Sequence, residues 1–171
     1  MPFPPLFSLV VPLAGAVILL LMGLFRRLRP YTRFVAPATM GFTMLGVLAT
    51  SLEPVRTIPL SLWRPSVFFG TFLALQPDPL VWPLAVATVC AATSAGMIQL
   101  SRRTQPHFVL VFSALGFLVA TLGSLWAENL LTVLFFWGCF DVAWALGMMA
   151  VDASPRRVAL SIGTTLLSTA A

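Results

Sequence analysis

Residues 126–151 read WAENLLTVLFFWGCFDVAWALGMMAV, and this stretch decides the fold class. It is apolar over more than the roughly 20 residues that an α-helix needs to cross a bilayer. One carboxylate, Asp141, lies near its middle. An ionisable group at that depth costs at least about 2.5 kcal/mol on insertion scales, and such groups usually serve a function. Asp141 is therefore the first candidate for a functional site.

The composition of the whole chain is typical of a membrane protein. Its 171 residues are 59% hydrophobic and 9% charged, whereas soluble domains carry about 25% charged residues. All ten basic residues are arginines in short loops between apolar runs, a pattern that indicates membrane topology and a bilayer partner rather than nucleic acid. The sequence holds no catalytic triad, phosphate-binding loop or Cys/His metal cluster. We expect Cys90 and Cys139 to be small buried hydrophobic residues, and we expect no catalytic or metal-binding residue.

Hydropathy and turn residues predict one all-α transmembrane domain over residues 1–171, with about five complete spans and part of a sixth. The complete spans are expected at 6–25, 34–52, 79–100, 107–126 and 129–151. The stretch 158–171 is too short to cross the bilayer, so the chain is either truncated there or ends in an interfacial tail. Between the second and third spans, three prolines and two β-compatible runs, 56–63 and 66–75, predict an extramembrane hairpin or an irregular loop.

Two predicted helices begin with acidic or amide side chains. Asp78 precedes Pro79 at the third span, and Glu128 with Asn129 opens the fifth, as the positive end of a helix dipole favours. The loops after spans one, three and five hold four, two and two arginines, which is eight of the ten. The positive-inside rule then predicts a multi-pass protein of the cell inner (plasma) membrane, with its N-terminus outside and its arginine-rich loops in the cytoplasm.

The fifth span resembles the antiporter-like, proton-conducting subunits of NADH-quinone oxidoreductase (respiratory complex I), which are related to cation/proton antiporter subunits. In that family the helix opens with Asp- or Asn-Leu-Leu and reaches Trp-Glu after an apolar stretch. The matching residues here are Asn129–Thr132, then 133–136, then Trp137–Gly138. The run PDPL at 77–80 is similar to a diverged form of the family's Val-Asp-Gly-Leu-Ser, and VPLAGA at 11–16 looks like its first helix.

This resemblance implies a membrane-arm subunit, or the N-terminal part of one, in a complex of the respiratory chain. It places the redox cofactors in other membrane-complex subunits, so we expect none in this chain, which would be at most a non-redox subunit of the enzyme. Its role would be proton conduction or helix scaffolding beside those partner subunits. Two alternatives stay open: a subunit of a multi-chain cation/proton antiporter, and a degenerate structural subunit that conducts nothing itself.

The family's proton-handling glutamate follows the tryptophan, and Gly138 takes that place here. Asp141 lies three residues later, on the same helical face. We hypothesise that Asp141 is a displaced proton-site carboxylate, with Trp137, Gly138, Glu128 and Asp78 as possible supporting residues. The alternative is a carboxyl group that is hydrogen-bonded to a neighbouring hydroxyl or backbone group.

Four further side chains share the predicted face of Asp141, at spacings of three, four and seven residues: Leu134, Trp137, Trp144 and Met148. We expect them to pack around the carboxyl group rather than to form a quinone site. The family's later, lysine-bearing helices have no counterpart before residue 171, so the resemblance extends to the N-terminal part of such a subunit.

Overall fold

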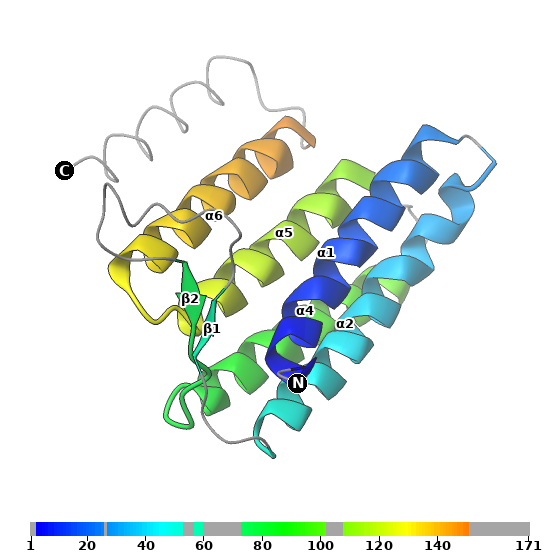
Figure 1. The fold of residues 1–171 in the computed structure, drawn as a ribbon. Helices are drawn as coiled ribbons and strands as arrows, with labels where there is room; N and C mark the ends of the chain where they lie inside the picture. Colours follow the sequence, from blue (N-terminus) through cyan, green and yellow to red (C-terminus); the bar gives the residue numbers. More distant parts are fainter. Residues whose placement is uncertain (1–2, 26, 53–56, 60–72, 102–107, 151–171) are drawn as a thin grey trace.

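The computed structural model describes residues 3–25, 27–52, 57–59, 73–101 and 108–150. This part of the chain is mostly helical (Figure 1). Its elements are α1 (Phe3–Leu24), the short 3-10 helix η1 (Arg29–Tyr31), α2 (Thr32–Thr50), β1 (Ile58–Pro59), β2 (Ala74–Leu75), α4 (Trp82–Ser101), α5 (Phe108–Leu125) and α6 (Leu130–Ala150). The five α-helices coincide with the five predicted complete spans, and each end agrees to within three residues.

Four of these helices are long and apolar enough to cross a membrane, so the predicted number of about five complete spans is not confirmed. The exception is α4, whose apolar part, Trp82–Ile98, is shorter. The predicted partial span at 158–171 lies outside the described residues.

Four helices form a closed bundle, and the fifth lies outside it. Around the bundle α1 contacts α2, α2 contacts α4, α4 contacts α5, and α5 contacts α1. Helix α6 packs against the outer side of α5, at the edge of the molecule (Figure 1). The candidate carboxylate is therefore carried by a peripheral helix rather than by a central one.

The bundle interior is apolar and tightly packed. Its fully buried side chains include Leu19, Val47, Val89, Leu115 and Leu122, one or more from each of the four helices. Within the described residues no charged side chain is buried. The buried polar side chains are serines and threonines, which can return their hydrogen bonds to the helix backbone.

Threonines of the second predicted span behave as hydroxyls do in an apolar helix. Thr39 donates to the carbonyl oxygens of Val35 and Ala36 at 2.9 and 2.8 Å, and Thr43 donates to Thr39 at 2.7 Å. These bonds stay within α2, so the hydroxyls need no functional role.

The strands confirm part of the predicted hairpin. β1 pairs antiparallel with β2, with Ile58 opposite Leu75 and Pro59 opposite Ala74. Residues 60–72, which include the predicted turn at Arg64-Pro65, lie outside the described residues.

β2 is also joined to the connection between α5 and α6. The Gln76 N–H donates to the Trp126 carbonyl at 2.7 Å, and the Glu128 N–H donates to the Ala74 carbonyl at 3.1 Å. Leu75 forms a bridge with Ala127 between these two bonds. The strand therefore lies over the end of the bundle at which α6 begins.

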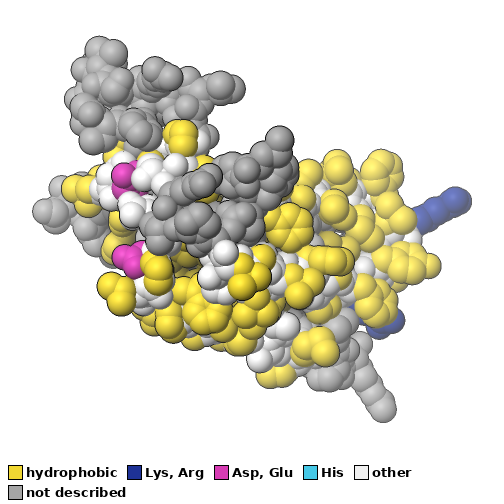
Figure 2. Space-filling model, turned by 60° about the horizontal axis from the view of Figure 1, so that its bottom comes forward, with side chains coloured by type: hydrophobic (Ala, Val, Ile, Leu, Met, Phe, Trp, Pro, Cys, Tyr) yellow, Lys and Arg dark blue, Asp and Glu magenta, His cyan; other side chains and the backbone are white. Residues whose placement is uncertain are grey.

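Charged side chains gather at the two ends of the molecule (Figure 2). Among the described residues, the arginines lie around the connection between α1 and α2, at positions 27, 29 and 33. Asp78 and Glu128 lie at the opposite end, where α4 and α6 begin. The surface between the ends is hydrophobic in Figure 2, as a bundle that crosses lipid requires.

Candidate functional site in the middle of α6

Helix α6 begins at a well-satisfied cap. Asn129 accepts hydrogen bonds at its Oδ1 from the N–H and the hydroxyl of Thr132, both at 2.9 Å. The Thr132 oxygen in turn accepts the Ala74 N–H at 3.0 Å. This arrangement confirms the predicted helix start, and it fixes α6 to β2 as well as to α5.

One side of α6 is buried against α5. Its buried residues are Thr132, Phe136, Ala143 and Gly147. A Cβ atom built at Gly123 of α5 would overlap the Phe136 ring, and one at Gly116 would lie 3.1 Å from the Ala143 side chain. Small residues on one helix therefore receive larger ones on the other, as is usual between membrane helices.

Asp141 lies on the opposite side of α6. It follows Thr132 by nine residues, which turns an α-helix through about 180° from the buried side at 3.6 residues per turn. The side chain is half-buried. It is the twelfth of 21 residues in α6, about 17 Å from the start of the helix at 1.5 Å per residue. The carboxyl group is thus at mid-span and directed away from α5.

Within the described ranges, no hydrogen bond or ion pair joins the Asp141 carboxylate to another residue. The described arginines belong to the far end of α1 and the start of α2. The expected alternative, a hydrogen bond to a neighbouring hydroxyl or backbone group, is therefore not seen in this part of the chain. A carboxyl group in lipid without such a partner is costly, so this face of α6 requires a partner.

Gly138 and Trp137 lie beside Asp141 as predicted. No atom lies within 4 Å of a Cβ built at Gly138, so the space next to the carboxyl group is open. The Trp137 side chain is half-exposed. Both residues could contribute to a contact made by this face.

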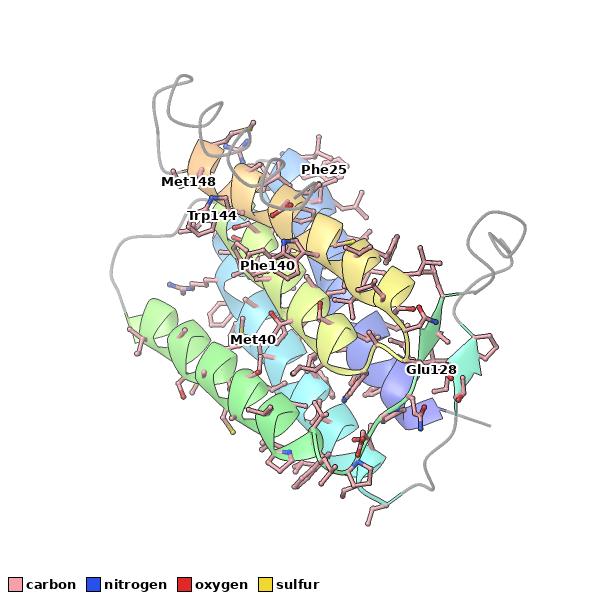
Figure 3. The ribbon with its side chains drawn as sticks, turned by 90° about the vertical axis from the view of Figure 1, so that its left-hand side faces the viewer. Phe25, Met40, Glu128, Phe140, Trp144 and Met148 are labelled. Atoms are coloured by element: carbon pink, nitrogen blue, oxygen red, sulfur yellow. The ribbon has the colours of Figure 1, made fainter. Side chains whose placement is uncertain are left out.

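The other two proposed supporting residues are not brought to the site. Asp78 accepts the Leu80 N–H at 2.8 Å and the Trp82 N–H at its carbonyl, and so caps the start of α4. Glu128 is exposed beside the strands, at the other end of α6 from Met148 (Figure 3). It precedes Asp141 by thirteen residues, about 20 Å along the helix. Both acids are helix-start residues at the surface end of the bundle.

Aromatic packing on one flank of Asp141 was not predicted from the sequence. The Phe117 ring of α5 meets Phe140 edge-on at 4.8 Å between centroids, and Trp144 at 6.1 Å. Figure 3 shows Phe140, Trp144 and Met148 along the same helix. The expectation that Trp144 packs near the carboxyl group thus acquires a partner on α5, which the sequence gave no means of identifying.

The cysteines and metal-binding groups give a simpler result. Cys90 is exposed on α4 and Cys139 is half-exposed on α6, so the expectation that both are buried is wrong for Cys90. No group of three His, Cys, Asp or Glu residues that could hold a metal ion occurs in the searched, described part of the chain.

Comparison with known proteins finds no family model that matches the chain and no curated protein that matches its sequence. The chemistry of the site has to be argued from the residues of α6 themselves.

Proposed function

We propose that this chain is a membrane-arm subunit, or the N-terminal part of one, of a proton-translocating complex similar to NADH-quinone oxidoreductase. The observation that carries the proposal is Asp141, a single carboxyl group at the middle of a helix that is long and apolar enough to cross the membrane. The opening of that helix at Asn129–Leu131 supports the same family. Redox chemistry would take place in partner subunits, and this chain would contribute proton conduction or helix scaffolding.

The geometry restricts how a proton could be handled. The described part of the four-helix bundle buries no charged side chain, so it offers no chain of carboxyl groups along which a proton could pass. Asp141 instead projects from the side of α6 that is opposite to α5. Proton transfer would therefore occur at the contact between α6 and another membrane chain, rather than through this bundle alone.

The charge distribution supports an orientation for the proposed subunit. Arg27, Arg29 and Arg33 lie at one end, and Asp78 and Glu128 at the other. Cytoplasmic loops carry an excess of basic residues. The arginine end would face the cytoplasm of a bacterial-type inner (plasma) membrane, and the N-terminus and the strands would face outward.

The test is proton translocation by the assembled complex with the substitution Asp141→Asn. This change keeps the size and the hydrogen-bonding capacity of the side chain but removes its titratable proton. We expect the number of protons moved per NADH oxidised to fall. Asp78→Asn is the matched control, since it removes a carboxyl group from the surface end of the bundle. Unchanged translocation in Asp141→Asn would remove Asp141 from the proton path.

Two observations favour a structural role as the second candidate. Gly138 takes the place of the family's glutamate, and Asp141 makes no bond within the described residues. A scaffolding subunit would assemble the complex normally, and the Asp141→Asn complex would pump protons as the wild type does. The third candidate, a cation/proton antiporter subunit, predicts rescue of growth under sodium or alkaline stress without an effect on NADH oxidation.

A further inference from the structure

The outward side of α6 carries a heptad pattern. Its members recur at alternating spacings of four and three residues: Leu130, Leu134, Trp137, Asp141, Trp144 and Met148. We call these six residues the outer seam. An apolar repeat of 3.5 residues on average is the pattern by which two parallel helices pack along a left-handed supercoil.

The outer seam is not used by the described bundle. Leu130, Leu134 and Trp137 are 73%, 46% and 50% exposed. The residues that α6 buries against α5 lie on the other side of the helix, so a second helix could occupy the outer seam without displacing α5. The surface is therefore available to a partner helix at the same depth in the membrane.

Asp141 occupies a position of the kind called a in this heptad, with Trp137 and Trp144 at the neighbouring d positions. A single polar residue at an a position fixes the register of a parallel coiled coil and favours two strands, since it meets its own equivalent. Hydrogen bonds between polar side chains also help to hold membrane helices together, where lipid removes the hydrophobic driving force. The one carboxyl group of the outer seam thus specifies a partner with the same residue at the same depth.

We propose that the outer seam pairs in parallel with the outer seam of a second copy of this chain. Two copies inserted with the same topology are related by a two-fold axis along the membrane normal, so residues of equal depth meet. One Asp141 carboxyl group, protonated, donates its O–H to the carboxylate of the other. The pair then holds one proton and one negative charge, and neither carboxyl group is left facing lipid alone.

Gly138 supports close approach beside this pair. The space that a Cβ atom at Gly138 would enter is empty to 4 Å. A glycine one turn before the acid therefore leaves room for the large Trp137 and Trp144 side chains to pack in the paired helices. The pairing requires no proton movement, so it stands or fails independently of the proposed transport function.

The experiment measures the association of the full-length chain in lipid bilayers. Cys90 and Cys139 are first replaced by alanine, and a single cysteine is then placed at Leu134 on the outer seam or at Phe135 next to it. The two positions have similar exposure, 46% and 50%, and nearly the same depth. We expect oxidation to link Leu134→Cys into a disulfide-bonded dimer several-fold more efficiently than Phe135→Cys. Equal linking of both variants would overturn the pairing.

Subunit counting by single-molecule photobleaching, over a series of protein-to-lipid ratios, gives the second readout. We expect Asp141→Leu to raise the dimer dissociation constant by about 3- to 30-fold, the effect of one interhelical hydrogen bond in a membrane. Asp141→Asn should keep the dimer, because asparagine side chains can also pair with each other. A wild-type chain that stays monomeric at every ratio, or one that dimerises equally well as Asp141→Leu, would contradict the proposal.

These outcomes also separate the pairing from transport. In the Asp141→Asn variant the two proposals predict opposite results, since proton translocation would fall while the dimer persists. Loss of one property therefore does not imply loss of the other.

Discussion

Replacing Thr132 by valine tests how α6 is fixed to the rest of the molecule. Thr132 is fully buried, and its hydroxyl oxygen accepts the Ala74 N–H at 3.0 Å while its proton goes to Asn129 Oδ1 at 2.9 Å. Valine has nearly the same shape. The substitution therefore removes both hydrogen bonds without opening a cavity.

The larger cost falls on Ala74. Ala74 is completely buried, and Thr132→Val leaves its N–H without an acceptor. An unsatisfied buried donor costs about 1–3 kcal/mol. Asn129 loses less, because it still accepts the backbone N–H of Thr132. The junction between β2 and α6 should therefore open about 5 to 140 times more often, at 1.4 kcal/mol per tenfold change.

Hydrogen exchange of the Ala74 amide in lipid nanodiscs measures this opening directly. We expect exchange to accelerate over that range in Thr132→Val, and the amide to stay protected in Thr132→Ser, which keeps the hydroxyl. Exchange within a factor of about two of wild type in the valine variant would refute the hydrogen-bonded junction. Equal acceleration in the serine variant would assign the effect to the lost methyl group instead.

The remaining predictions concern glycines and a helix cap. Gly123→Ala should lower the free energy of unfolding in detergent by about 1–3 kcal/mol, because the new methyl group overlaps the Phe136 ring. Gly138→Ala, its matched control on the open side of α6, should leave stability unchanged or raise it by up to about 1 kcal/mol; equal losses would show that the buried side of α6 is misassigned. Asp78→Ala removes the acceptor of the Leu80 N–H and should cost about 1 kcal/mol, measured in the same assay. No loss in Asp78→Ala would mean that the cap contributes nothing.

The helices were predictable from the sequence because two strong signals agree along most of the chain. Apolar runs of membrane length define each helix, and arginines, prolines and acidic residues define the ends. Asn129 and Asp78 are examples, since their side chains accept backbone N–H groups at the helix starts that were predicted for them. These signals are local, which is why the boundaries agree closely.

The arrangement of the helices was not predictable, because it depends on contacts between distant residues. Thr132 and Ala74 are 58 residues apart, and nothing in either stretch announces their hydrogen bond. The spacing of Ala87, Ala91 and Ala95 indicated a close helix contact, yet all three are exposed, and α4 buries Ala85 instead. In lipid both sides of a helix can be apolar, so hydropathy does not reveal which side faces a neighbour.

The candidate site shows the same division. Hydropathy alone places Asp141 in the middle of a long apolar helix. It could not show that α6 lies outside the four-helix bundle, or that Asp141 lies on the side opposite to α5. A helix that is apolar on every side carries no periodic signal for its buried face, and only the glycine contacts with α5 establish it.

The reaction of single cysteines with a membrane-impermeant maleimide, in sealed vesicles of known orientation, tests the central feature of this account. With Cys90 and Cys139 replaced, we expect a cysteine at Glu128 to react only from outside and one at Arg33 to react only from the cytoplasmic side. A cysteine at Asp141 should be protected from both sides, since it lies at mid-span about 20 Å from Glu128. Labelling at position 141 as fast as at position 128 would mean that the acid lies in water, and a carboxyl group held within the membrane could then carry neither the proton nor the helix contact proposed here.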